Sequence, residues 1–304
     1  MGAWSLSEKV ILITGGGRGI GAATARELAR RGALTVLADL DGEALAATAA
    51  GISPAPLTIE LDVTDQHACE AAVEQVLAQR GRLDVVWANA GIGSGGPLHL
   101  TDPAAWRRTI EVNLVGAYYT VRAALPAVIE ARGYVAVTAS LASFSHSPGM
   151  SAYCATKAGV EAMCDSLRVE MAHHGVEVGT IHPSWIDTDL VREGDESRAF
   201  RVFRDALRPP FKKTYPVQRA VTDIVAGFER RSRRICTPRF VYAAHALRSV
   251  LNTPAMQRDQ LAVTPEMERI FEQDLAERGR EAASISERGA RQLAHAEDFS
   301  AGVR

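Results

Sequence analysis

Tyr153 and Lys157 stand four positions apart in the segment YCATK, and Ser140 precedes them in the chain. Residues at i and i+4 project from one face of a helix, so the phenol and the ammonium would be neighbours. A free phenol has a pKa of about 10, which a nearby ammonium and a positively charged nicotinamide ring would lower. Such a phenol could exchange a proton with a substrate whose oxygen Ser140 holds. A surface Tyr–Lys pair and a structural serine are the alternatives.

A glycine-rich segment near the N-terminus, TGGGRGIG from Thr14 to Gly21, follows a β-branched run and opens a helical pattern. This is the context that a phosphate-binding turn requires. Gly15 would allow the tight turn, Gly19 would let the backbone approach a pyrophosphate, and Gly21 would permit close packing of helix on sheet. The start of the helix would present N–H groups to the phosphates. A surface loop that happens to hold glycines is the alternative for this segment alone.

Asp39 ends the second predicted strand, near the offset at which an acid meets the ribose hydroxyls of a dinucleotide. A carboxylate there accepts hydrogen bonds from the 2′-hydroxyl and repels a 2′-phosphate, so it favours NAD over NADP. The alternative is a helix N-cap, a role that we assign to Asp41. Arg18 could pair with a 2′-phosphate. With Asp39 present, we interpret Arg18 as a pyrophosphate or surface contact.

Two further segments follow predicted strands and fit a dinucleotide. Asp62 and Val63 come after the third strand, where a carboxylate could lie near the adenine amine, unless Asp62 is a solvated turn residue. Asn89, Ala90 and Gly91 come after the fourth strand and form a loop small enough to pass beside the adenosine ribose.

Asn113 lies midway in the helical pattern from Pro103, among apolar neighbours in IEVNLVGAYY. Asparagine is a poor residue for a helix interior, so its presence needs a reason. One reason is a kink that binds water and links Lys157 to solvent. The other is a polar group whose hydrogen bonds are satisfied in the core.

The first 240 residues alternate strand-like and helical patterns, which predicts an α/β fold with a doubly wound parallel sheet between two layers of helices, of the Rossmann type. Residues 241–304 are expected to form a C-terminal helical extension of the same domain. The predicted strands are Val10–Thr14, Leu34–Ala38, Leu57–Leu61, Val85–Ala88, Tyr134–Thr138, Val176–Ile181 and Ile235–Thr237. The predicted helices are Ile20–Arg31, Gly42–Ala50, Gln66–Arg80, Pro103–Arg132, Ala152–His174 and Pro216–Arg231. In the extension, Asn252–Thr264 has the composition of a loop and Pro265–Ala296 that of one or two exposed helices.

Composition excludes several classes of function. A formal net charge of −2 argues against nucleic acid as a partner. We find no apolar run of the roughly 18 residues that a membrane span needs, and no apolar leader before the first strand. The 4 cysteines lack zinc-ligand spacing, which predicts reduced thiols in a cytoplasmic protein without a metal.

The ordered set TGxxxGxG, Asp39, NAG, Asn113, Ser140 and YxxxK resembles the short-chain dehydrogenase/reductase family, over roughly Lys9 to Pro238. The resemblance implies a catalytic tetrad of Asn113, Ser140, Tyr153 and Lys157. Tyr153 would be the acid/base, Ser140 would orient the substrate, Lys157 would hold the nicotinamide ribose and lower the phenol pKa, and Asn113 would position a relay water. It also implies a homodimer or homotetramer formed through the helices that bear Asn113 and Tyr153.

The family's PGxxxT segment appears here as PSWIDT, from Pro183 to Thr188. Thr188 would contact the nicotinamide carboxamide, whereas Ser184 replaces the usual glycine and Ala88 stands where a second asparagine is frequent. The residues expected to bind NAD are Gly15, Arg18, Gly19, Ile20, Gly21, Asp39, Asp62, Val63, Asn89, Ala90, Gly91, Tyr153, Lys157, Pro183 and Thr188.

Large apolar residues gather in the two segments that would cover the substrate. They predict a bulky, apolar alcohol or ketone, such as a terpenoid, steroid or aromatic compound, unless they only pack the covering segment on the core. Ser140, Leu141, Met150, Trp185 and Leu190 are the expected substrate contacts, with Phe144, Val191, Phe200, Phe203 and Phe211 nearby. The sequence therefore predicts an NAD-dependent alcohol dehydrogenase or ketone reductase. A non-catalytic dinucleotide-binding regulator would not need Ser140, Tyr153 and Lys157, and an epimerase or dehydratase that retains NAD is disfavoured by the glycine spacing.

Overall fold

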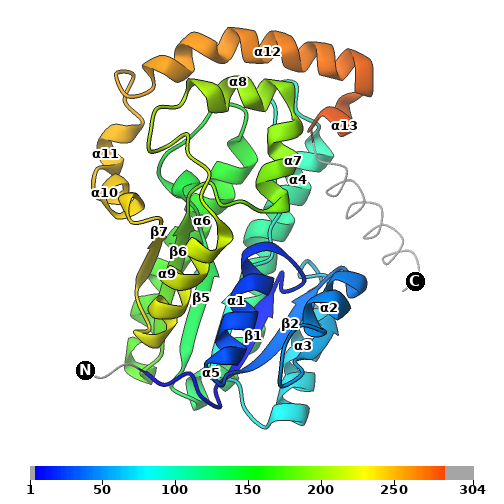
Figure 1. Cartoon of the computed structure of the whole chain (residues 1–304), viewed down its shortest axis with the longest axis vertical. Helices are drawn as coiled ribbons and strands as arrows, with labels where there is room; N and C mark the ends of the chain where they lie inside the picture. Colours follow the sequence, from blue (N-terminus) through cyan, green and yellow to red (C-terminus); the bar gives the residue numbers. More distant parts are fainter. Residues whose placement is uncertain (1–3, 285–304) are drawn as a thin grey trace.

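The structure is a computed structural model that describes residues 4–284. Seven parallel strands form one sheet in the order β3-β2-β1-β4-β5-β6-β7 (Figure 1). The strands are β1 (Val10–Thr14), β2 (Leu34–Asp39), β3 (Leu57–Glu60), β4 (Val85–Ala88), β5 (Tyr134–Thr138), β6 (Glu177–Pro183) and β7 (Arg234–Thr237). The predicted Rossmann-type architecture is confirmed, and each predicted strand lies within two residues of the observed bounds.

Helices cover both faces of the sheet because the strands alternate two sets of apolar side chains. Val10 and Leu12 face one core and Ile11 and Ile13 face the other, as the two-residue period of a strand requires. The first core is covered by α3 (Gln66–Arg80), α5 (Gly116–Glu130) and α6 (Ser151–Met171). The second is covered by α1 (Gly19–Arg30), α2 (Gly42–Ala49) and α9 (Val217–Glu229).

The predicted helix Pro103–Arg132 is interrupted. It consists of α4 (Pro103–Ile110), a π-helical turn (Glu111–Val115) and α5, so Asn113 sits in the π turn. Within the part of the chain that is described, this is also the one helix that is long and apolar enough to cross a membrane. Half of its most apolar window is buried, and it packs on α3, α6 and the sheet, so we assign it to the core.

The loops at the carboxyl edge of the sheet carry four short elements and the extension. Three of these are a 3₁₀ turn (Leu141–Ser143), α7 (Asp189–Glu196) and α8 (Arg198–Ala206), and the fourth is α4, which follows β4. A second 3₁₀ turn, Ala172–His174, ends α6 at the opposite edge, before β6. The extension comprises α10 (Phe240–Ala246), α11 (Arg248–Leu251), α12 (Arg258–Arg278) and α13 (Arg280–Ser284). In Figure 1, α12 runs across the end of the molecule that lies beyond α8, far from the N-terminus.

Two expectations for the extension were wrong. Asn252–Thr264 is not all loop, because α12 begins at Arg258 and continues through Pro265. Nor is α12 simply exposed, since Met267, Phe271 and Asp274 are buried against α8 and its neighbours. The remainder of the predicted helical stretch, up to Ala296, lies outside the described residues.

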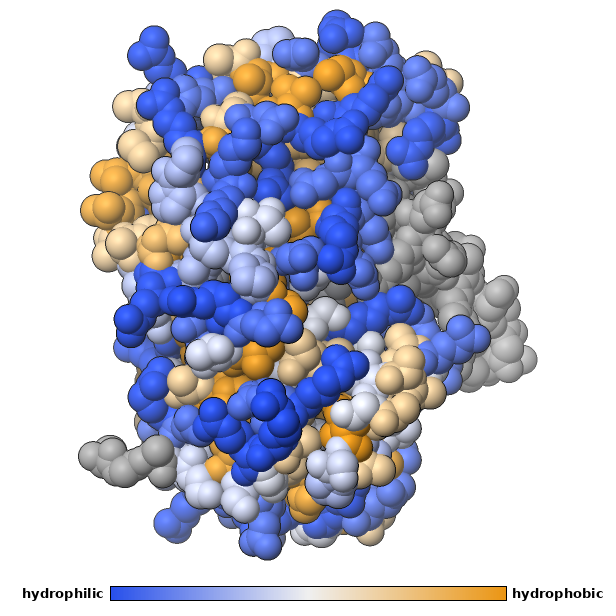
Figure 2. All heavy atoms as spheres, in the orientation of Figure 1, coloured by the Kyte–Doolittle hydropathy of each residue, from blue (hydrophilic) through white to orange (hydrophobic). Residues whose placement is uncertain are grey.

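The surface of the extension includes an apolar patch. Leu247 and Val250, which are 57% and 45% exposed, lie on α10–α11. Figure 2 shows apolar residues gathered over these elements at the left edge of the molecule, whereas much of the rest of this face is hydrophilic.

Candidate active site

The glycine turn between β1 and α1 has the backbone that a phosphate site needs. Gly15 and Gly19 have φ values of +65° and +53°, a region that favours glycine. A Cβ on Gly21 would stand 2.3 Å from the Gly15 carbonyl oxygen, so only glycine allows this packing of helix on turn. Arg18, the N-cap of α1, makes no side-chain capping bond, and the first turn of α1 holds no acid. The first N–H groups of α1 are therefore available to an anion.

Asp39 lies at the end of β2 against this turn. Its Oδ2 accepts a 3.0 Å hydrogen bond from the Gly17 N–H, and its Oδ1 accepts one of 3.2 Å from the Asp41 N–H. Asp41 caps α2 by accepting from the Ala44 N–H, so the N-cap alternative for Asp39 is wrong. Arg18 forms an ion pair with Asp41, which makes it a surface contact next to the turn.

Asp62 is held by partners that the sequence did not reveal. It accepts hydrogen bonds from the N–H and hydroxyl of Thr64 and forms a 3.0 Å ion pair with Arg108 of α4. Burial opposes ionisation of Asp62, but these partners outweigh it and hold its pKa below the ordinary value. Asp62 is therefore not a solvated turn residue. Together with Val63 it lines the pocket described below.

The NAG loop after β4 is tied to both neighbouring strands. Asn89 donates to the carbonyls of Thr14 and Gly15 at 3.1 and 3.2 Å and accepts from the Thr138 hydroxyl at 3.0 Å. A Cβ on Gly91 would stand 3.3 Å from Asn113 Oδ1. The loop thus joins β1, β4 and β5 at the carboxyl edge, and its lack of bulk leaves space beside the glycine turn.

The structure bears out a part of each of the two interpretations of Asn113. The kink is present as the π turn, but the Asn113 side chain itself bonds the loop after β4. Its Oδ1 accepts from the Ile92 N–H at 2.8 Å, and its Nδ2 donates to the Ile92 carbonyl at 2.9 Å. It is 1% exposed and is a satisfied core amide that fixes this loop.

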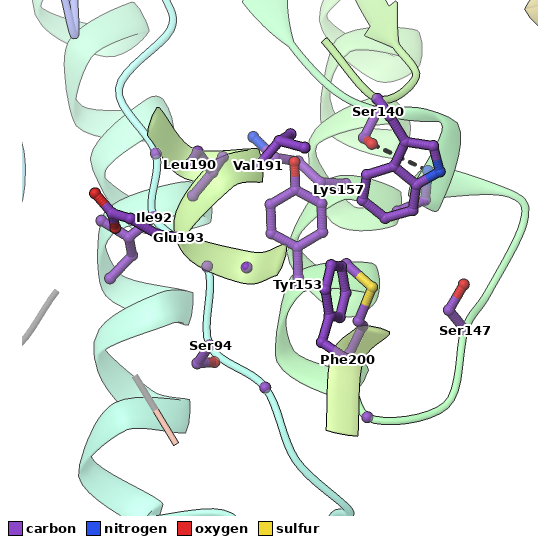
Figure 3. A pocket seen from close by; sticks show the side chains of 18 of the residues that line it. Ile92, Ser94, Ser140, Ser147, Tyr153, Lys157, Leu190, Val191, Glu193 and Phe200 are labelled. Atoms are coloured by element: carbon purple, nitrogen blue, oxygen red, sulfur yellow. Dashed lines mark hydrogen bonds between the residues drawn. The ribbon is translucent and has the colours of Figure 1, made fainter. Parts of the chain in front are cut away.

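Ser140, Tyr153 and Lys157 converge at the carboxyl ends of β5 and β6 (Figure 3). The Lys157 Nζ lies 5.5 Å from the centroid of the Tyr153 ring and donates a 2.8 Å hydrogen bond to the Thr138 carbonyl. The Ser140 Oγ accepts a 3.1 Å hydrogen bond from the Ala142 N–H. All three line one pocket with the glycine turn and Asp39.

Burial governs the ionisation of this group. It raises the pKa of Tyr153 to about 12, and a hydrogen bond with Ser140 offsets the rise only in part. Burial also lowers the pKa of Lys157 to about 8. The expectation that Lys157 lowers the phenol pKa is therefore not met by the chain alone. Desolvation favours the neutral form of both groups, and a positive charge bound beside the phenol would favour its phenolate form.

Two residues that sequence reasoning missed hold the Ser140 backbone in place. The Ser143 Oγ accepts from the Ser140 N–H at 3.2 Å and donates to the Lys157 carbonyl at 2.9 Å. His182 Nδ1 lies 3.1 Å from the Ser140 carbonyl, and its Nε2 lies 2.9 Å from the Thr180 hydroxyl. Burial lowers the pKa of His182 to about 4, so the ring is neutral near pH 7 and donates from Nδ1 to Ser140.

The expected substrate contacts line the same pocket, whose volume is about 670 Å³. Leu141, Met150, Trp185 and Leu190 are all part of its wall, as is Phe200. Phe203 was expected nearby, but it is fully buried in the apolar cluster between α8 and α12. Met267 and Phe271 of α12 also line the pocket, and the sequence did not indicate them.

Pro183, Ser184 and Thr188 line the pocket as well, and Thr188 Cγ2 lies close to Gly19. The serine in place of glycine does not disrupt the turn, because the Ser184 N–H donates to the Thr237 carbonyl at 2.9 Å.

Comparison with known proteins identifies the family of the chain. The family model for short chain dehydrogenase matches residues 9–199. The chain is 36% identical, over 61% of its length and 75% of the relative, to trans-4-hydroxycyclohexanecarboxylate dehydrogenase of Sinomonas cyclohexanicum. It is 31% identical, over 71% of its length and 83% of the relative, to (−)-trans-carveol dehydrogenase of Rhodococcus erythropolis.

A solved structure shares the fold. The 3-ketoacyl-(acyl-carrier-protein) reductase of Brucella melitensis complexed with NADH superimposes with a TM-score of 0.69, at 27% identity, over 77% of this chain and 98% of that one. The family model spans the glycine turn, the NAG loop and the Tyr153–Lys157 helix. This chain belongs to the short-chain dehydrogenase family and is an oxidoreductase acting on an alcohol or ketone.

Proposed function

We propose that the chain is an NAD-dependent dehydrogenase that interconverts a bulky, apolar secondary alcohol and its ketone, with Tyr153 as the acid/base. The observation that carries the proposal is the convergence of Tyr153, Lys157 and Ser140 in one pocket with the glycine turn. That pocket combines a phosphate-binding backbone with a proton donor and acceptor. A dinucleotide-binding regulator would need only the first.

The residues present fit a dinucleotide. The N–H groups of the first turn of α1 would hold its pyrophosphate, Asp39 its ribose hydroxyls, and Asp62 and Gly91 would flank its adenosine. When bound, nicotinamide supplies a hydride acceptor or donor and a positive charge. Asp39 supports a preference for NAD because a 2′-phosphate would meet its carboxylate, while the Arg18 guanidinium is already paired with Asp41.

The chain's own residues would handle the proton. In alcohol oxidation the Ser140 hydroxyl would hold the substrate oxygen, and the Tyr153 Oη would take the proton from it. Lys157 would hold the nicotinamide ribose and supply charge beside the phenol. Asn113 would act through the loop that it bonds and the π turn that it occupies, where the water of a proton relay could bind.

The apolar wall supports a hydrophobic substrate. Trp185, Leu190 and Met150 offer no charge to a substrate, and the two relatives are named for dehydrogenation of ring alcohols, 4-hydroxycyclohexanecarboxylate and carveol. Exposed Tyr118 on α5 and Val169 on α6 support a homodimer or homotetramer through these helices. Four free, buried cysteines agree with the proposed cytoplasmic location.

The test is a panel of secondary alcohols assayed with NAD⁺ and with NADP⁺, followed by absorbance of the reduced nicotinamide. We expect turnover with apolar ring alcohols and a higher kcat/KM with NAD⁺. Turnover confined to small polyols or sugars would contradict the substrate class, and a preference for NADP⁺ would contradict the role of Asp39.

A further inference from the structure

The far end of the pocket is closed by a segment that lies beyond the part matched by the family model. Residues 258–284, comprising α12 and α13, are called here the C-terminal cover. Figure 1 shows α12 lying across α8, and these two helices pack directly on each other. Met267 and Phe271, which are 4% and 2% exposed, point from α12 into the apolar cluster at the pocket wall.

Two glycines, which lack side chains, leave room for Phe271 and Met267. A Cβ on Gly96 would stand 2.3 Å from the Phe271 ring, and a Cβ on Gly149 would stand 3.4 Å from the Met267 Cε. The two loops are joined there, because the Gly96 N–H donates to the Gly149 carbonyl at 2.9 Å. These loops follow β4 and β5, and both line the pocket near Tyr153. The cover therefore packs on the pocket wall itself.

Ion pairs fasten the cover to α8 at both ends of α12. Arg198, at the start of α8, lies 2.9 Å from Asp274, whose side chain is 9% exposed. Arg208, just after α8, donates to Asp259 at 2.9 Å. The two helices thus run antiparallel and are linked by an ion pair at each end.

Ser284 fastens the cover on the opposite side of the pocket. Its carbonyl accepts from the Gly95 N–H and its hydroxyl accepts from the Asp102 N–H, each at 2.9 Å. Ser284 is 1% exposed. The cover therefore spans the pocket from α8 to the loop after β4, with Met267 and Phe271 between its two attachments.

We propose that Met267 and Phe271 set the upper size limit of the bulky, apolar substrate, so that the enzyme takes secondary alcohols with a single substituted ring and excludes those with a second ring extending away from the carbinol carbon. This inference rests on the proposed function and deepens it. Because packed apolar side chains resist displacement, an extra ring at the far end of the substrate must displace them or stay out. Shortening them opens that space.

The test compares kcat/KM for cyclohexanol, 4-methylcyclohexanol and 4-cyclohexylcyclohexanol in the wild type and in Phe271→Ala and Met267→Ala. We expect the wild type to prefer the methyl to the cyclohexyl compound by at least about tenfold. Phe271→Ala should remove most of that preference, and Met267→Ala part of it. Leu261→Ala is the matched control, because Leu261 lies on the same helix but is 60% exposed. It should keep the wild-type ratio.

A further variant and a binding assay distinguish a change in size selectivity from a failure to fold. Phe271→Leu retains more of the buried volume and should shift the ratio in the same direction even if Phe271→Ala folds poorly. A thermal-shift assay with 4-cyclohexylcyclohexanone plus NAD⁺, which cannot transfer a hydride to a ketone, reports binding without turnover. It should show a larger increase of Tm for the Phe271 variants than for the wild type.

An unchanged size ratio and an unchanged ketone-induced shift in folded Phe271 and Met267 variants would overturn the size-limit proposal. Absence of turnover with every alcohol, combined with the expected difference in ketone binding, would instead overturn the proposed function and support the size limit.

Discussion

The Lys157 ammonium donates a 2.8 Å hydrogen bond to the main-chain carbonyl of Thr138 and lies 5.5 Å from the centroid of the Tyr153 ring. A strand end thus fixes the lysine that accompanies the phenol. The lysine is 3% exposed, and burial lowers its pKa to about 8. Burying this ammonium beside the phenol lowers the stability of the folded protein, and that loss of stability can be measured.

Lys157→Met should alter the pH dependence of stability. The pKa of Lys157 falls from 10.5 unfolded to about 8 folded, so between those values the unfolded chain binds more protons. The free energy of unfolding of the wild type therefore rises with pH through that window. Below about pH 8, burial of the charged lysine lowers this free energy by its full amount, roughly 3 kcal/mol. The free energy of unfolding of Lys157→Met minus that of the wild type should therefore fall by roughly 2 kcal/mol between pH 7 and pH 10.

Urea unfolding at several pH values measures this difference. Lys213→Met is the control, because Lys213 is exposed, and its difference from the wild type should stay constant. If the Lys157→Met difference were also independent of pH, Lys157 would not be a buried ammonium with a lowered pKa.

Asp39→Ala should weaken discrimination against NADP. Removing the carboxylate removes the repulsion of a 2′-phosphate and the acceptor for the ribose hydroxyl. We expect the ratio of kcat/KM for NAD⁺ over NADP⁺ to fall by at least about tenfold, consistent with the several kcal/mol that juxtaposed like charges cost. Glu43→Ala removes an exposed acid from the start of α2 and should leave the ratio unchanged. An unaltered ratio in Asp39→Ala would remove Asp39 from this role.

Ser143→Ala should impair turnover more than cofactor binding. Ser143 accepts from the Ser140 N–H and donates to the Lys157 carbonyl, so its loss leaves the buried Ser140 N–H without this acceptor and removes the link from Ser140 to α6. We expect kcat to fall on the order of tenfold with the KM for NAD⁺ nearly constant, because misplacement of a substrate-orienting group affects the chemical step.

The controls for Ser143 separate positioning from general destabilisation. Ser143→Thr keeps the hydroxyl and should restore part of kcat, whereas Ser166→Ala, at an exposed position of α6, should behave as the wild type. Equal losses in kcat and in affinity for NAD⁺, without rescue by threonine, would show that Ser143 has only a structural role.

Much of the site could be predicted because its residues sit at fixed offsets within single elements. The pair Tyr153 and Lys157 needs only helical periodicity, and Gly15 and Asp39 need only their places at strand ends. The sequence also indicated that Asn113 was unusual. It could not distinguish the π turn from the hydrogen bonds to Ile92, because those bonds are tertiary contacts.

The unpredicted parts depend on contacts between distant segments. Arg108 reaches Asp62, Ser143 reaches the Lys157 carbonyl and His182 reaches the Ser140 carbonyl only once the sheet has formed. The local capping box of Ser140 and Ser143 is the one sequence signal that could have indicated Ser143. Pro265 suggested the start of a helix, yet α12 begins at Arg258 because packing on α8 outweighs the hydrogen bond that proline cannot donate. Burial of Phe271 against Gly96 followed from the same packing.

The most direct test of the account is Tyr153→Phe, measured for turnover of a ring alcohol and for NADH affinity by fluorescence titration. Removing the phenol oxygen should lower kcat by roughly 10²–10⁴-fold, the range for loss of a general acid/base, and leave the Kd for NADH nearly unchanged. A variant that keeps wild-type turnover would contradict the assignment of Tyr153 as the proton-transfer residue.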